Sequence, residues 1–127
     1  MKIMIVDDSE VLCERLTQLI GEIAGAEVVG YARGTGEAME KVDILNPDVV
    51  ILDIRLADGN GINVLAQIKN AHPGIYVLMF TNYPYLLYRE KCFSAGADYF
   101  FCKSTEFEKL IEVIRYLTDE FVKIPHK

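Results

Sequence analysis

The 127-residue sequence contains no tryptophan, only two histidines and three cysteines. His72 and His126 lie in no cluster of metal-ligand residues, which argues against a zinc site or a Ser-His-Asp triad. The cysteines are odd in number and no two are spaced as Cys-x-x-Cys; they are Cys13, Cys92 and Cys102. This usage favours reduced thiols and a cytoplasmic location.

Basic residues and long apolar runs are also scarce. The chain has 13 lysines and arginines against 19 acidic residues, a formal net charge of −6. Since a nucleic-acid-binding domain carries a basic patch, we expect no direct binding to nucleic acid. The apolar runs are far shorter than the roughly 18 residues of a membrane helix, so no membrane association is predicted.

What the sequence does contain is a repeated unit of a β-rich run, a turn and an amphipathic stretch. The expected strands are residues 3–6, 27–31, 48–52, 75–80 and 98–102. Helices are expected from a cap at Ser9 or Asp8 to an end before Gly25, over 36–45 and 62–70, from Pro84 to Gly96, and over 107–121. The third and fourth runs contain continuous apolar residues, as in strands buried on both faces of a parallel sheet.

This strict alternation predicts one α/β domain. We expect a three-layer, flavodoxin-like sandwich of five βα units around a parallel five-stranded sheet of order 2-1-3-4-5. In such sheets the ligand site lies beyond the carboxyl ends of the strands, where the order reverses between the first and third strands. Those ends are therefore where functional residues are expected.

Chemically distinctive residues follow four of the five expected strands. They are Asp7, Asp8, Asp53, Thr81 and Lys103. Three neighbouring carboxylates repel one another unless a cation joins them, and Mg²⁺ with oxygen ligands and a phosphoryl group is a common solution. A carboxylate is ionised at neutral pH and needs no general base to act as a nucleophile. The set predicts phosphoryl transfer onto a carboxylate, with the metal and the lysine stabilising the transition state.

At these positions the chain resembles the receiver domains of two-component response regulators. The resembling segments are residues 3–9, 47–54, 58–61, Thr81 and 95–103. The expected strand order is also the order of this family, whose chemotaxis member is a standard example of the fold. The resemblance implies a receiver domain over residues 1–121 and a C-terminal tail or start of a linker over 122–127. The chain is expected to be either a stand-alone receiver or part of a longer regulator.

The resemblance also implies a role for each site residue. Asp53 would be the phosphoacceptor, and Asp7 and Asp8 would bind Mg²⁺ together with Asp53 and the backbone carbonyl of Arg55. The phosphoryl group would come from a sensor histidine kinase or a phosphotransfer protein. The domain would catalyse only its own phosphorylation and dephosphorylation, and so would not be an enzyme with a separate substrate.

Two further roles concern the signal that follows phosphorylation. Thr81 and Lys103 would contact the phosphoryl group, and Thr81 and Phe100 would act as switch residues. The switch would change the face formed by helix 4, strand 5 and helix 5, which would regulate a partner or an output domain and could form a homodimer. The aromatic segment of residues 82–88 is consistent with a partner-binding surface there.

The sequence departs from the family pattern near the site. Ser104 follows the lysine where proline is usual, and since a cis non-proline bond costs about 3 kcal/mol we expect a trans peptide. Arg55, Asn82 and Tyr83 flank the path of the attacking water and are expected to tune the rate of dephosphorylation. None of these three supplies a carboxylate that would hold the water in line, so a long-lived phosphoaspartate is predicted.

Three alternatives remain at this point. A flavodoxin-type FMN carrier would need a phosphate-binding loop after the first strand, where this chain has acidic residues. An aspartyl-phosphate phosphatase would need an Asp-x-Asp motif, which neither acidic segment supplies. A pseudo-receiver that acts without phosphorylation would be expected to lack an acid or the lysine, and all of them are present here.

Overall fold

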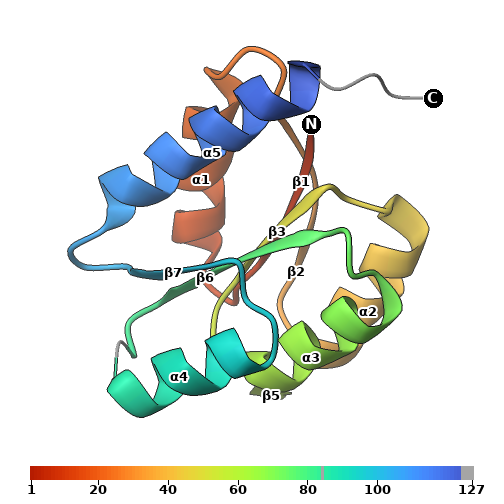
Figure 1. The fold of residues 1–127 in the computed structure, drawn as a ribbon, viewed down its shortest axis with the longest axis vertical. Coiled ribbons are helices and arrows are strands. Elements are labelled where there is room, and N and C mark those ends of the chain that lie inside the picture. Colours follow the sequence, from red (N-terminus) through yellow and green to blue (C-terminus); the bar gives the residue numbers. More distant parts are fainter. Residues whose placement is uncertain (84, 124–127) are drawn as a thin grey trace.

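The five expected strands form one parallel sheet in the computed structural model, which describes residues 1–83 and 85–123 (Figure 1). Its strands are β1 (Lys2–Val6), β2 (Glu27–Ala32), β3 (Val49–Leu52), β6 (Tyr76–Thr81) and β7 (Tyr99–Cys102). The order β2-β1-β3-β6-β7 is the predicted order 2-1-3-4-5, counted over these five strands. The fold class predicted from the sequence is therefore confirmed.

Five helices cover the two faces of the sheet. They are α1 (Glu10–Gly21), α2 (Thr35–Leu45), α3 (Gly61–Ala71), α4 (Leu86–Ser94) and α5 (Phe107–Lys123). Helices α1 and α5 lie on one face, and α2, α3 and α4 lie on the other (Figure 1). This arrangement gives the three predicted layers.

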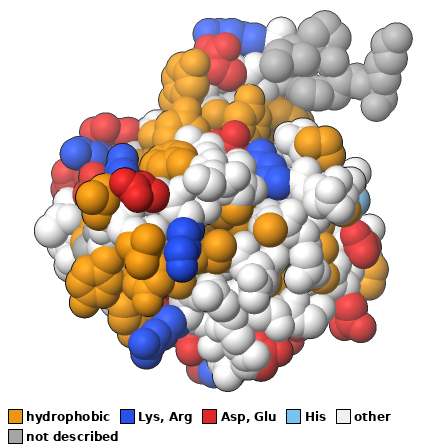
Figure 2. All heavy atoms as spheres, turned by 60° about the horizontal axis from the view of Figure 1, so that its bottom comes forward, with side chains coloured by type: hydrophobic (Ala, Val, Ile, Leu, Met, Phe, Trp, Pro, Cys, Tyr) orange, Lys and Arg blue, Asp and Glu red, His pale blue; other side chains and the backbone are white. Residues whose placement is uncertain are grey.

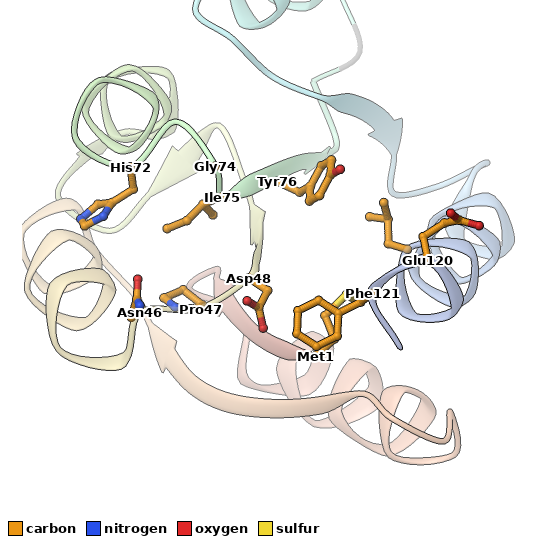
Figure 3. Close-up of a pocket in the computed structure, with 11 residues that line it drawn as sticks. Met1, Asn46, Pro47, Asp48, His72, Gly74, Ile75, Tyr76, Glu120 and Phe121 are labelled. Atoms are coloured by element: carbon orange, nitrogen blue, oxygen red, sulfur yellow. The ribbon is translucent and has the colours of Figure 1, made fainter. Parts of the chain in front are cut away.

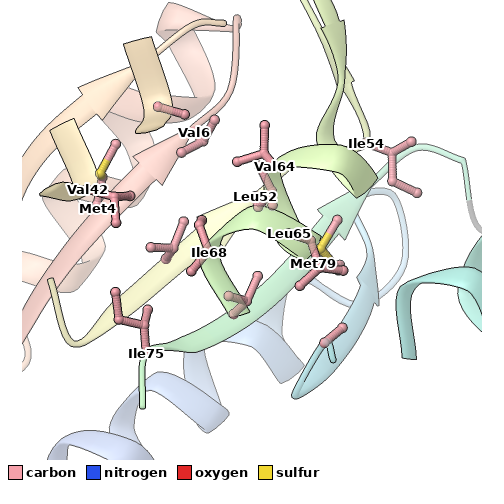
Figure 4. Packing of buried hydrophobic residues seen from close by; sticks show 14 of the residues in the cluster. Met4, Val6, Val42, Leu52, Ile54, Val64, Leu65, Ile68, Ile75 and Met79 are labelled. Atoms are coloured by element: carbon pink, nitrogen blue, oxygen red, sulfur yellow. The ribbon is translucent and has the colours of Figure 1, made fainter. Parts of the chain in front are cut away.

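Alternate residues of each central strand point into two separate cores, as the period-2 geometry of a strand requires. In β1, Met4 packs in the core beneath α2, α3 and α4 (Figure 4), whereas Ile3 and Ile5 pack beneath α1 and α5. Because β1, β3 and β6 are covered on both faces, all their residues are buried except Lys2 and Tyr76 at the amino ends of β1 and β6. This double burial explains the unbroken apolar runs in the sequence.

The helix boundaries follow local signals in most places. The Ser9 hydroxyl caps α1 by accepting a hydrogen bond from the Leu12 amide at 3.3 Å. The expected start of the fourth helix at Pro84 lies outside the described residues, and α4 begins at Leu86. Helix α5 continues to Lys123, and residues 124–127 also lie outside the described part, so the domain boundary after residue 121 stays a prediction.

One element was not predicted. After β3 the chain forms a short antiparallel ribbon of β4 (Arg55–Leu56) and β5 (Gly59–Asn60) before α3 begins. Asn60 then caps α3, because its side-chain oxygen accepts a hydrogen bond from the Ile62 amide at 2.8 Å. In the described part of the chain, no helix combines the length and apolar character needed to cross a membrane.

Candidate functional site

Parallel strand pairing brings four of the predicted site residues to the same edge of the sheet. Asp7 and Asp53 directly follow the neighbouring strands β1 and β3, and the Asp53 amide donates to the Val6 carbonyl at 3.0 Å. Thr81 ends β6, and its carbonyl accepts a hydrogen bond from the amide of Lys103 at 2.9 Å. The backbone ladder thus places both acids beside the lysine.

The centre of the site is an ion-paired triad. The Lys103 ammonium lies 2.7 Å from Asp7 Oδ2 and 2.8 Å from Asp53 Oδ2. The second oxygen of each carboxylate accepts a backbone hydrogen bond, from the Ser9 amide at 2.9 Å and from the Ile54 amide at 2.7 Å. Two buried carboxylates therefore share one ammonium, a charge balance that leaves the triad with a net negative charge when both acids are ionised.

Burial and charge oppose one another in this triad. Burial raises the pKa of Asp7 above its ordinary value, and the hydrogen bond from Lys103 offsets only part of that effect. For Lys103, burial is the largest single effect and would lower the pKa, but the hydrogen bonds to Asp53 and Asp7 and the charges of both acids together outweigh it, and the pKa is raised. Lys103 is thus held in its charged form, whereas ionisation of Asp7 lowers the stability of the folded state.

A cavity of about 450 Å³ opens beside the triad. Its lining residues are Asp8, Ser9, Leu12, Asp53, Arg55, Asn82, Tyr83 and Lys103. Six of these were singled out from the sequence: Asp8, Asp53 and Lys103 for the metal or the phosphoryl group, Asn82 and Tyr83 as residues that tune the rate, and Arg55 for both. Asp53 is therefore one of the residues that line an open cavity.

Arg55 and Tyr83 contact each other at this cavity. The Arg55 guanidinium carbon lies 4.6 Å from the centre of the Tyr83 ring, within the range of a cation–π contact. The pair joins β4 to the segment after β6 beside Asp53. The sequence predicts that both residues flank the path of the attacking water, but nothing in it indicates that they touch.

Three predicted residues do not line the cavity. Asp7 lies behind it in the triad, and Phe100 is buried in the core, with its ring 6.5 Å from that of Phe93. Thr81 is fully buried, and its hydroxyl oxygen accepts a hydrogen bond from the Tyr83 amide at 3.2 Å. Contact of Thr81 with a phosphoryl group therefore stays a prediction.

The donor set determines which cation the site fits. Among residues 1–83 and 85–123, no three acidic, histidine or cysteine side chains are gathered into a ready metal site. Asp8 and Asp53 nevertheless present carboxylates to the cavity beside Arg55. Mg²⁺ commonly binds to one or two carboxylates and completes its shell with water and phosphate oxygens, so these residues fit a partly hydrated Mg²⁺.

Gly61 is a site residue to which the sequence assigned no role. Its amide donates to the Ile54 carbonyl at 2.6 Å, and a Cβ atom added at this position would lie 1.9 Å from the carbonyl oxygen of Asp53. Only glycine allows α3 to start this close to Asp53. The signal that could have revealed it is the Asp58-Gly59-Asn60-Gly61 segment, which was noted only as part of the family resemblance.

Comparison with known proteins agrees with this geometry. The family model described as "Response regulator receiver domain" matches residues 3–115, and the chain belongs to that family. A receiver domain protein described as CheY-like, from Methanospirillum hungatei JF-1, superposes with a TM-score of 0.84 at 30% identity, covering 96% of each chain.

Two curated relatives are longer proteins. The DNA-binding transcriptional activator DevR/DosR of Mycobacterium tuberculosis is 40% identical over 82 residues, which are 65% of this chain and 38% of the relative. The response regulator GacA of Pseudomonas syringae pv. syringae is 27% identical over 114 residues, which are 90% of this chain and 53% of the relative. The chain thus matches about half or less of the length of these relatives.

Proposed function

We propose that this domain is the phosphoacceptor of a two-component phosphorelay and takes a phosphoryl group onto Asp53 with the help of Mg²⁺. The observation that carries the proposal is the triad, in which Lys103 holds Asp7 and Asp53 beside an open cavity. A sensor histidine kinase or a phosphotransfer protein would be the donor. The three cysteines are free thiols, in line with the proposed cytoplasmic location.

The proposed reaction is an in-line displacement at phosphorus. A carboxylate oxygen of Asp53 attacks the phosphoryl group of a phosphohistidine; the new P–O bond forms as the P–N bond breaks, and the electron pair stays on the imidazole nitrogen. Lys103 neutralises charge on the phosphoryl oxygens. Mg²⁺, held by Asp8, Asp53 and the Arg55 carbonyl with Asp7 behind them, would neutralise further charge when bound.

The output is proposed to pass through the face formed by α4, β7 and α5. Tyr85, Leu86 and Leu87 are largely exposed at the start of α4. Hydrophobic side chains gather with lysines and arginines on the side of the molecule that carries α4 (Figure 2). Such a surface suits a protein partner or a second copy of the domain.

Inside the domain, Phe100 would couple the phosphorylation site to the surface of α4. Its ring is buried in β7, and the Arg89 guanidinium of α4 lies over it, 5.6 Å from the ring centre. A shift of Thr81 toward a phosphoryl group would therefore be passed to α4 by way of Phe100 and Arg89. Because the named relatives include a DNA-binding activator, transcription is the output we propose, with DNA contacts made by another domain.

The decisive experiment is phosphorylation by acetyl phosphate in the presence of Mg²⁺. Intact-mass measurement should show the gain of one phosphoryl group. Chelation of the metal and the Asp53→Ala substitution should each abolish the gain, whereas Glu40→Ala, which removes an exposed acid of α2, should leave it unchanged. Equal labelling of the Asp53→Ala variant would show that another residue is the acceptor, and no labelling of the parent would favour a pseudo-receiver.

A further inference from the structure

The N-terminus of helix α2 has no capping side chain at its own N-cap position. The capping group comes instead from Asp58, which lies in the turn between β4 and β5. The N-cap residue of α2 is Gly34, which has no side chain to bond the first turn. Instead, the Thr35 amide donates a hydrogen bond to Asp58 Oδ1 at 2.6 Å. That bond is the largest of the effects that lower the pKa of Asp58, so its carboxylate is ionised at the positive end of the helix.

The β4–β5 turn packs closely against the segment that precedes α2. The Ala57 amide donates to the Arg33 carbonyl at 3.2 Å, next to the Asp58 bond. A Cβ atom at Gly34 would lie 2.7 Å from Asp58 Oδ1, although the backbone of Gly34 is extended and would accept any residue. The glycine therefore leaves room for the carboxylate and serves no other conformational need.

Two short routes lead from this contact to the phosphorylation site. Along the ribbon, Asp58 is three residues from Arg55, whose carbonyl is a proposed Mg²⁺ ligand and whose guanidinium contacts Tyr83. Through the turn before α2, the Arg33 guanidinium donates to the backbone carbonyl of Asp8 at 3.3 Å. Both proposed ligands that are presented by loops, Arg55 and Asp8, thus connect to the segment that Asp58 holds.

We propose that Asp58 is a positioning residue that anchors the β4–β5 ribbon to α2 and so holds Arg55 and Asp8 in place for Mg²⁺ binding and phosphorylation. This inference rests on the proposed function. Asp58 itself does not line the cavity, so its effect is indirect. Groups that orient metal ligands from behind commonly change metal affinity by about tenfold or more when they are removed.

The test compares four variants with the parent. Asp58→Ala removes the acceptor, Asp58→Asn keeps a carbonyl oxygen that can accept the Thr35 hydrogen bond, and Gly34→Ala displaces the carboxylate from the opposite side. Glu40→Ala is the matched control, an exposed acid on the same helix. Each is measured for its Mg²⁺ Kd by calorimetry without a phosphodonor, for its phosphorylation rate with acetyl phosphate, and for its melting temperature.

We expect Asp58→Ala to raise the Mg²⁺ Kd and slow phosphorylation by about tenfold each, the lower end of the effect of such groups. Asp58→Asn should restore most of both. Gly34→Ala should act in the same direction and still fold, because only the flexible end of the Asp58 side chain must move. Since both substitutions break one contact, the double variant Gly34→Ala/Asp58→Ala should be no worse than Asp58→Ala.

The inference is overturned if Asp58→Ala matches Glu40→Ala in Mg²⁺ affinity and phosphorylation rate and differs only in melting temperature, because Asp58 would then merely cap a helix. It is also overturned if the effects of Gly34→Ala and Asp58→Ala multiply in the double variant. If the parent itself takes up no phosphoryl group, the proposed function fails and this inference fails with it. The parent measurement thus separates the two failures.

Discussion

The two edges of the sheet carry cavities of similar size, but one is lined by charged groups and the other mostly by apolar side chains. The cavity at the carboxyl edge, about 450 Å³, faces the ion-paired triad. The cavity at the amino edge, about 370 Å³, is lined mostly by apolar side chains such as Ile75 and Phe121 (Figure 3). Leu117 of α5 also lines it.

The polar residues of the amino-edge cavity have structural partners. Asp48 Oδ2 accepts a hydrogen bond from the Lys2 amide at 2.8 Å, and His72 Nε2 lies 2.8 Å from Asp43 Oδ1. At the carboxyl edge, by contrast, Asp8 has no ion-pair partner among residues 1–83 and 85–123. Strand direction, more than cavity size, therefore locates the site, because the loops at the carboxyl ends of the strands converge there.

The largest expected effect comes from the amino edge and concerns stability alone. Leu117 of α5 is buried beside the amino-edge cavity, and Leu117→Ala should lower the free energy of unfolding by about 2–5 kcal/mol. Urea denaturation measures this loss. Under conditions in which the variant remains folded, its phosphorylation rate should equal that of the parent, and a matching fall in rate would break the separation between the two edges.

The next effect concerns Mg²⁺ at the carboxyl edge. Asp8→Ala should raise the Mg²⁺ Kd at least about tenfold, because it removes one of the two carboxylates that face the cavity. The exposed Asp8 side chain adds repulsion and no ion pair, so the melting temperature without metal should hold or rise. Calorimetry and thermal melts measure the two quantities, and a marked fall in metal-free stability would make Asp8 chiefly structural.

A third effect concerns the lifetime of phospho-Asp53. The Arg55–Tyr83 pair at the cavity is bulky and lacks a group to hold water in line, so the parent should dephosphorylate slowly. Tyr83→Glu and Arg55→Asn should each speed the decay by about tenfold through better positioning of the water. Tyr85→Glu is the control, since exposed Tyr85 lies outside the cavity. Decay of the parent within seconds, with no acceleration in the variants, would contradict this mechanism.

The smallest expected effect concerns the stability lost by burying the charged carboxylate of Asp7. The pKa of Asp7 is raised by burial, so its ionised form destabilises the folded state as the pH rises above the ordinary carboxyl range. Asp7→Asn should therefore melt a few degrees higher than the parent at pH 7 without metal. The difference should shrink as the pH falls through the raised pKa of Asp7, because the side chain then takes up a proton and loses its charge. A lower melting temperature at pH 7 would mean that the Lys103 pair outweighs burial.

Local sequence determined the strands, most helix boundaries and the residues at the carboxyl edge. Period-2 and continuous apolar patterns report directly on burial, so the five strands were located to within about one residue at each end. The Lys103–Ser104 peptide is trans, as the cost of a cis non-proline bond predicted. Asp7, Asp53, Thr81 and Lys103 could be found because each directly follows or ends a strand.

Tertiary structure alone decided which of these groups touch. A pattern shows which edge a side chain reaches, but the 2.7 Å and 2.8 Å contacts of Lys103 depend on how distant loops pack. The same holds for the borrowed cap that Asp58 gives α2 and for the stacking of Arg55 on Tyr83, which join segments distant in sequence. Such contacts leave no local periodicity, because they are selected by the shape of the assembled fold and by the electrostatics of groups that only folding brings together.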